Sequence, residues 1–175
     1  MKTILVPIDF SKNAGNALLY AINIAEKMHA KIILLHAFHI EYTNAYVPVH
    51  IIENMIKEKQ KKSTKQLKEL YNTVAHHTKS SFEFLSIEDL AVDAILKTAT
   101  EKSVDYIIMG TLGATGSIGK RVFGTNSSNV IAKAPCPVIA IPEDNPHSNI
   151  KTITYLTNYL DSDIACLQNL VDIAK

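Results

Sequence analysis

Cysteine is scarce in this chain. The two cysteines, Cys136 and Cys166, are too few for a disulfide framework and lack the spacing of a metal site. Such a composition fits a reducing compartment. The chain also lacks an apolar run of ~18 residues, the length of a membrane span, and the run after Met1 is too short for a signal peptide. We therefore expect a cytoplasmic protein that has no membrane partner.

An excess of charge of one sign is also missing. Lysine and arginine total 18 and aspartate and glutamate 17, so the net charge is +1. This balance gives no global electrostatic case for nucleic acid, and we expect none as a partner. Glycine is scarce everywhere except in one stretch, because five of the six glycines lie between Gly110 and Gly124. At 175 residues, the chain can form one full domain with a remainder.

Alternating apolar patterns predict the fold. Continuous apolar runs predict five buried strands, at residues 3–8, 31–38, 81–87, 104–109 and 138–141. Amphipathic spacing predicts four helices between them, at residues 14–25, 51–77, 90–102 and 126–134. Ser11 or Asn13 can cap the first helix and Asp89 the third. The alternation predicts an α/β protein with an open, doubly wound, parallel sheet.

The second predicted helix has an unusual middle. Residues 57–65 contain six charged residues and no apolar one. We expect this part to project into solvent, although a basic surface patch for a partner is the alternative.

The end of the chain resembles its beginning. Lys151-Thr152-Ile153 repeats Lys2-Thr3-Ile4, and in the same register Leu167 falls on Leu18. We interpret residues 143–149 as a linker and residues 150–175 as the first strand and helix of a second, incomplete copy. The alternative is chance similarity of two strand–helix units. A repeat would make this chain part of a longer tandem protein.

The glycine-rich stretch is the main candidate for chemistry. A strand, a glycine-rich loop and a helix N-terminus form the arrangement that cradles phosphate on backbone N–H groups. The stretch is neither a Walker A motif nor the Rossmann fingerprint, which follows the first strand. In an open α/β sheet the loops after the first and fourth strands can face each other, here residues 7–11 and 110–125. Asp9 then either contacts a ligand or caps the first helix.

Several motifs together resemble the universal stress protein family. They are Val6-Pro7-Ile8-Asp9-Phe10-Ser11, Leu35-His36-Ala37, Met109-Gly110-Thr111-Leu112-Gly113, Gly124-Thr125-Asn126-Ser127 and Ala134-Pro135-Cys136-Pro137-Val138. The resemblance covers residues 1–142, and residues 150–175 resemble the opening of a second such domain. It implies an adenine nucleotide alpha-hydrolase-like fold with strand order 3-2-1-4-5.

The resemblance also implies a site for ATP, alone or with Mg²⁺. Pro7 and Asp9 would form one wall, with Asp9 at ribose, phosphate or a bound divalent ion. Ala37 would offer backbone hydrogen bonds to adenine, and Gly110 and Gly113 would let the backbone approach the nucleotide. The residues that would bind phosphates are Gly124, Thr125, Asn126 and Ser127.

One feature of the loop departs from the family pattern. The ATP-binding branch has nine residues between the second and third glycines, whereas ten separate Gly113 from Gly124 here. The extra residue is either absorbed as a bulge near residues 117–119 or displaces the phosphate cradle. Lys120 and Arg121 either add charge to the cradle or face solvent.

The remaining candidates favour structural roles. His36 and His39 would point to opposite faces of a strand, so we interpret them as core or edge histidines. We interpret Cys136 as a small apolar residue that fills space in the core. No catalytic constellation is evident, so we expect a binding protein with at most slow ATP hydrolysis, not an ATP-cleaving transferase or ligase. The alternative is a scaffold without nucleotide that acts through dimerisation. A homodimer would form through residues 138–141 or the partial second copy.

Overall fold

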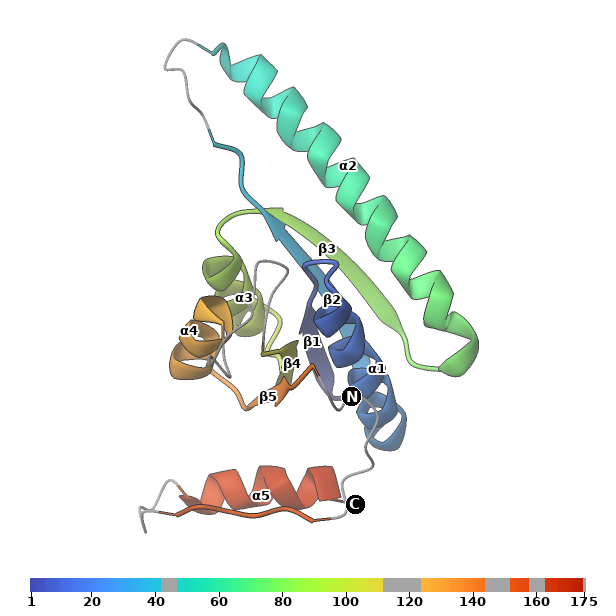
Figure 1. The fold of residues 1–175 in the computed structure, drawn as a ribbon, viewed down its shortest axis with the longest axis vertical. Helices are drawn as coiled ribbons and strands as arrows, with labels where there is room; N and C mark the ends of the chain where they lie inside the picture. Colours follow the sequence, from blue (N-terminus) through green and yellow to red (C-terminus); the bar gives the residue numbers. More distant parts are fainter. Residues whose placement is uncertain (42–46, 112–123, 144–151, 158–162, 175) are drawn as a thin grey trace.

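The fold is seen in a computed structural model, which describes residues 1–41, 47–111, 124–143, 152–157 and 163–174 (Figure 1). The strands are β1 (Thr3–Pro7), β2 (Lys31–Phe38), β3 (Phe82–Glu88), β4 (Tyr106–Gly110) and β5 (Val138–Ile141). The helices are α1 (Lys12–Met28), α2 (Val49–Val74), α3 (Ala91–Glu101), α4 (Thr125–Lys133) and α5 (Asp163–Ala174). A short 3-10 helix, Ala75–His77, follows α2.

The five strands form one parallel sheet in the order β3-β2-β1-β4-β5. This confirms the predicted strand order and the open α/β architecture. The central strands are buried on both faces because helices cover both, which is why their sequences read as continuous apolar runs. Figure 1 shows α1 and α2 on one face and α3 and α4 on the other.

Two apolar cores lie on the two faces of the sheet. Successive strand residues point to opposite faces, so Ile4 and Val6 pack with α1 and α2, whereas Leu5 packs with α3 and α4. Burying an Ile or Leu side chain contributes roughly 1.5–3 kcal/mol. These cores fix the position of each strand end, and therefore of the loops that follow.

Helix α1 begins and ends with defined caps. Ser11 is its N-cap, and the Ser11 hydroxyl accepts a hydrogen bond from Ala14 N at 3.1 Å. This confirms one of the two predicted caps. His29 ends the helix in the left-handed region at φ 50°. The predicted cap of α3 is wrong, because Leu90 takes the N-cap position and the Asp89 carboxylate accepts from Leu90 N instead, at 2.8 Å.

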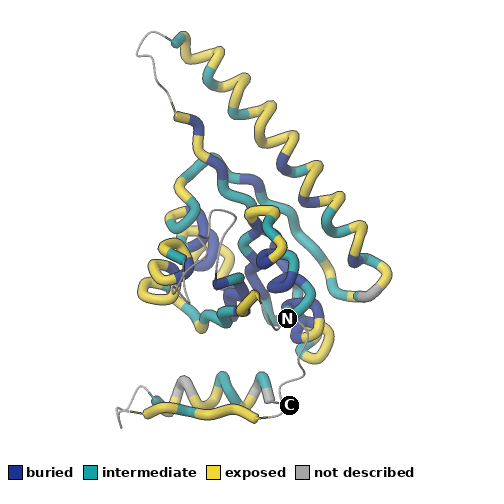
Figure 2. Tube along the Cα trace, in the orientation of Figure 1, coloured by how far each residue is buried: buried dark blue, intermediate teal, exposed yellow. Residues whose placement is uncertain are grey.

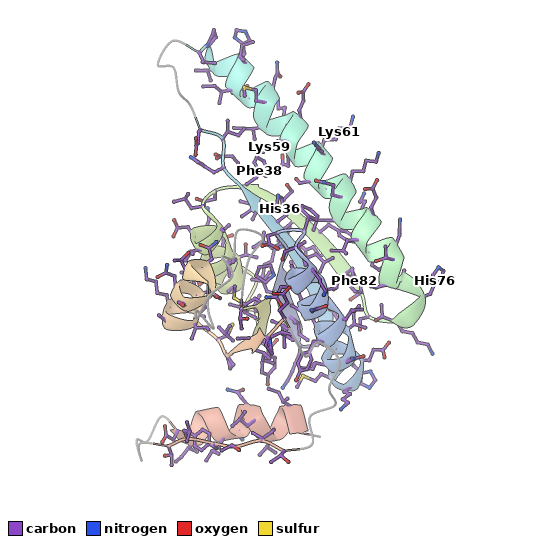
Figure 3. The ribbon with its side chains drawn as sticks, in the orientation of Figure 1. His36, Phe38, Lys59, Lys61, His76 and Phe82 are labelled. Carbon is purple, nitrogen blue, oxygen red and sulfur yellow. The ribbon has the colours of Figure 1, made fainter. Side chains whose placement is uncertain are left out.

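The middle of α2 does not stand clear of the sheet, so the prediction that it projects into solvent is wrong for one of its faces. Ser63 is 3% exposed, and its hydroxyl hydrogen-bonds the Ser86 hydroxyl on β3. Gln60 donates to Ser86 O at 2.8 Å, and Lys59 donates to His39 O at 3.1 Å. Figure 3 shows Lys59 on the side toward Phe38 and Lys61 on the opposite side.

These polar contacts explain how a helix segment without apolar residues can cover a strand. β3 is an edge strand, and its outer backbone groups need hydrogen-bond partners. The side chain of Gln60 supplies one for Ser86 O. The opposite face of α2 is exposed along its length, as the lysine-rich sequence predicts (Figure 2). One face of this part of α2 therefore makes polar contacts with β3, and the opposite face is exposed to solvent.

The C-terminal part contacts the rest of the fold through α5, whose Ile173 packs against the apolar core on the α1 face of the sheet. Residues 152–157 run beside α5 without forming a strand, and the Tyr155 hydroxyl donates to Asp163 O at 3.3 Å (Figure 1). A helix occurs where the proposed second copy requires one, but the second copy itself stays a prediction. Most of the predicted linker, residues 144–149, lies outside the described residues. In the described ranges, no helix is long and apolar enough to cross a membrane.

Glu83 offers a test of the contacts between β2, β3 and the end of α3. Its carboxylate accepts from Lys102 Nζ at 2.8 Å and from Lys31 Nζ, and these two hydrogen bonds lower the pKa of Glu83. A lowered carboxyl pKa stabilises the fold above the ordinary value of 4.5 and loses that contribution as the pH falls through the folded-state pKa.

We expect Glu83→Gln to lower the free energy of unfolding at pH 7 by up to about 1 kcal/mol, the usual range for partly exposed ion pairs. The difference from wild type should shrink below pH 4.5. Urea denaturation at several pH values measures it, with Glu101→Gln at an exposed position as the control. An equal loss at pH 7 and pH 3 would contradict this assignment.

Candidate functional site

The candidate site lies at the carboxyl ends of β1 and β4. These strands are neighbours, but β1 leads into α1 on one face of the sheet and β4 leads toward α4 on the other. Ligands of open α/β sheets bind at such a switch point, where the connections diverge. The structure therefore brings the segment after β1 to the same edge as the end of β4, while residues 112–123 of the second predicted loop lie outside the described residues.

Register places three residues level across this edge. β1 pairs with β2 as Thr3 with Lys31, and with β4 as Ile4 with Tyr106. Counting on in the same register sets Asp9 level with Ala37 on one side and with Thr111 on the other. Pro7 is the last residue of β1 and pairs with Leu35. Continued past the paired residues, the register thus sets two predicted site residues, Asp9 and Ala37, level with Thr111.

Asp9 lies in the turn between β1 and α1. Its Oδ1 accepts from Ser11 N at 3.0 Å, and its side chain is exposed. Ser11 supplies the helix cap, so Asp9 does not do so. Phe10, between them, adopts φ 61°, a left-handed conformation that costs a non-glycine residue ~1–2 kcal/mol. The turn holds Asp9 at the carboxyl edge of the sheet in a strained backbone.

Ala37 lies where β2 continues past the end of β1. Hydrogen bonds along β2 alternate: Lys31 N bonds Lys2 O on the β1 side, and Ile32 N bonds Ser81 O on the β3 side. The last backbone bond to the β1 segment is Ile8 N to Leu35 O, at 2.8 Å. By this alternation the N–H and C=O of Ala37 point toward β1, beyond its final residue. Both groups therefore point past the end of β1, at the edge where the candidate site lies.

The start of α4 is tied to the end of β4. Gly124 N donates to Thr111 O at 2.6 Å, and the Ser127 hydroxyl donates to the same oxygen at 2.8 Å. Ser127 is 3% exposed, so its hydroxyl joins α4 to β4 instead of facing outward. The N-cap, Gly124, has no side-chain capping bond. The first-turn N–H groups of α4 have no partner within the helix, so the positive end of its dipole lies next to the end of β4.

Gly110 has a structural reason to be glycine. A Cβ placed on it would lie 2.7 Å from Cγ and Nδ2 of Asn13, a buried side chain of α1. Real Cβ atoms do not tolerate such a distance, so the glycine lets the end of β4 approach α1. The sequence offered Asn13 only as a possible cap and gave no signal of this contact.

Part of the predicted site lies outside the described residues. This applies to Gly113, to Lys120 and Arg121, and to the ten-residue spacing before Gly124. Thr125 and Asn126, by contrast, lie exposed in the first turn of α4.

The two histidines and the cysteine considered in the sequence contact other parts of the fold. His39 pairs with Glu88 at 3.2 Å, and the His36 ring contacts Phe10 and Ile8 O. Burial, with a smaller effect of Asp105, raises the pKa of the Cys136 thiol to about 11. The thiol is therefore neutral at pH 7, as expected of a filler that packs beside Val138 and not of a nucleophile.

Fold and site together define an α/β protein of the kind that binds ligands at a topological switch point. The universal stress protein family matches residues 1–142. A universal stress protein of Thermus aquaticus is 29% identical over 140 residues, covering 80% of this chain and 98% of the relative. The chain therefore belongs to the universal stress protein family.

Solved structures agree on the fold. The universal stress protein UspA of Lactobacillus plantarum superposes with a TM-score of 0.70 at 23% identity, over 80% of this chain and 97% of that one. A universal stress family protein of Arabidopsis thaliana, solved with AMP bound, gives a TM-score of 0.57 at 20% identity, over 83% and 94%.

The contact between Gly110 and Asn13 can be tested without a ligand. We expect Gly110→Ala to lower the free energy of unfolding by about 1–3 kcal/mol, because an overpacked core must shift. Guanidinium denaturation measures the loss. Gly15→Ala is the matched control, since nothing lies within 4 Å of its added Cβ and alanine is the better helix former. A neutral or stabilising Gly110→Ala would show that the close approach to Asn13 is not as described.

Proposed function

We propose that this protein is a stress-response or signalling module that binds an adenine nucleotide, ATP in the first instance. The observation that carries the proposal is the strand register, which, continued past the paired residues, sets Ala37, Asp9 and Thr111 in a line across the sheet edge. At one end of this line are the backbone groups of Ala37 and at the other is the N-terminus of α4. A base, a ribose and a phosphate chain need these three kinds of surroundings in this order.

The base would bind at Ala37. A backbone N–H and C=O that point the same way offer one donor and one acceptor, which match an edge carrying one acceptor and one donor. The N6 amino group and a ring nitrogen of adenine form such an edge. Pro7 and Asp9 would border the ribose.

The phosphates would bind at the start of α4. Backbone N–H groups and the helix dipole attract anions at a helix N-terminus. Thr125 and Asn126 are exposed there, whereas Ser127 would contribute its N–H and not its buried hydroxyl. Asp9 could accept a Mg²⁺ ion carried by the nucleotide. Gly113 would complete the phosphate loop.

A binding role fits better than a catalytic one. In the described part of the chain, no group of three or more His, Cys, Asp or Glu side chains could hold a metal ion. The AMP bound in the related Arabidopsis protein supports an adenine nucleotide as ligand. Hydrolysis of ATP would be slow at most, because its rate would depend on attack by water that reaches the bound phosphates from solvent.

A scaffold that works through dimerisation is the second candidate. The sheet has two edges, and side chains of α2 cover that of β3. In the described part of the chain, the edge of β5, residues 138–141, is the one that could pair with a second copy. The C-terminal segment, residues 150–175, would be the other route to a homodimer in a cytoplasmic protein.

Calorimetric titration with ATP and Mg²⁺ tests the proposed function. We expect saturable binding, and stabilisation of the fold by about 2.7 kcal/mol when ATP exceeds its dissociation constant a hundredfold. Asp9→Asn should weaken ATP·Mg²⁺ binding, because it removes the charge that would face the metal. Asp93→Asn, an exposed carboxylate of α3, is the control and should bind as wild type does.

Protein that binds neither ATP nor AMP at millimolar concentration, and carries no nucleotide after purification, would contradict the proposal. Such a protein with a concentration-dependent dimer would favour the scaffold.

A further inference from the structure

We propose that His36 is a positioning residue, which keeps the N–H of Ala37 available to a ligand by occupying the carbonyl that this N–H would otherwise bond. The inference rests on the proposed function for the identity of the ligand. The effect of His36 on the Ala37 N–H does not depend on that function. Figure 3 labels His36 on β2, between α1 and α2 and close to the turn that carries Asp9. His36 is not among the site residues that the sequence analysis inferred.

The backbone pattern shows what His36 prevents. In a parallel ladder each bonded residue donates to one neighbour and accepts from the next but one. Ile8 N already donates to Leu35 O at 2.8 Å. The next step would be Ala37 N donating to Ile8 O, which would lengthen the β1–β2 ladder. Within the described residues, Ile8 O has a different partner: the His36 ring, with Nδ1 at 2.7 Å.

The chemistry of this contact fixes the proton. A carbonyl oxygen only accepts, so Nδ1 of His36 must carry the hydrogen. The ring is partly buried beside the backbone, where an unbonded carbonyl would be costly. The side chain therefore satisfies Ile8 O in place of the backbone, and the ladder ends before Ala37.

The same ring supports the turn that holds Asp9. The ring centroids of His36 and Phe10 lie 4.6 Å apart, and Phe10 is the residue with φ 61°. Strained backbone persists only where its surroundings hold it, and it clusters at functional sites. His36 thus contacts the residues on both sides of Asp9, through Ile8 O and through the ring of Phe10. It acts on the ligand through Ala37 and the turn and does not itself touch the ligand.

Two nearly isosteric substitutions isolate the hydrogen bond. Asparagine places an amide N–H near the position of Nδ1, whereas leucine has the same shape and no donor. Both remove the contact with Phe10, so a difference between His36→Asn and His36→Leu reports the bond to Ile8 O. His39→Leu is the control, three residues along the chain, where the histidine pairs with Glu88.

The first measurement is amide hydrogen exchange by NMR, without nucleotide. In the wild type we expect Ala37 to exchange faster than Leu35, and a long-range nitrogen–proton spectrum to find the His36 ring proton on Nδ1. In His36→Leu the Ala37 N–H should bond Ile8 O and exchange at least about tenfold more slowly, as in a protected strand. His36→Asn and His39→Leu should keep the fast exchange.

The second measurement is affinity for ATP. We expect His36→Leu to bind about tenfold more weakly, the usual effect of one lost hydrogen bond, and His36→Asn to recover most of the affinity. Equal exchange at Ala37 in the Leu and Asn variants would overturn the proposal, as would slow exchange in the wild type. If the wild type binds no nucleotide, the proposed function fails while the exchange data still decide the role of His36. The wild-type exchange rates and the ring-proton spectrum test the proposal even if one of the variants does not fold.

Discussion

The structure depends on where β1 ends relative to its neighbours. β1 is the middle strand, and it stops at Pro7 while β2 runs on to Phe38. Because parallel strands bond in a fixed alternation, the backbone groups of Ala37 face the chain just past this end of β1, where Ile8 O bonds the His36 ring and not Ala37 N. The turn that contains Asp9 follows the end of β1. The hydrogen bond from Gly124 N to Thr111 O brings the start of α4 to the end of the neighbouring strand, β4. Strand length and register, together with the His36 side chain, place the candidate site at this edge.

The two faces and two edges of the sheet are treated differently. Apolar cores cover both faces, so the central strands cannot move without exposing them. At the β3 edge, Gln60 and Ser63 of α2 hydrogen-bond Ser86, while Tyr71 of α2 packs on Phe82 and Phe84 of the same strand. The hydrogen bond from Gln60 gives the outward carbonyl of Ser86 a partner, so this part of the edge is less open to pairing with another chain. The candidate site lies at the carboxyl ends of the strands and not at either edge of the sheet.

Much of this could be predicted from the sequence, for physical reasons. Continuous apolar runs such as Ile32 to Leu35 define buried strands, and the alternation of strands with helices fixes the architecture. Ser11 was predictable as a cap because its hydroxyl suits that position. The polar contact at Ser63 was not, since periodicity weighs only apolar residues. The contact of Gly110 with Asn13 and that of His36 with Ile8 O join residues far apart in the sequence, so no local pattern reveals them.

The central claim is that one ligand spans the line from Ala37 through Asp9 to the start of α4. Nitrogen–proton NMR spectra recorded while ATP and Mg²⁺ are added to labelled protein test it most directly. The account predicts that amide signals of Ala37, Asp9 and residues 125–127 shift together with a single dissociation constant, while that of Ser63, on α2, stays in place. Shifts confined to one end of the line, or to α2 or α5, would contradict it.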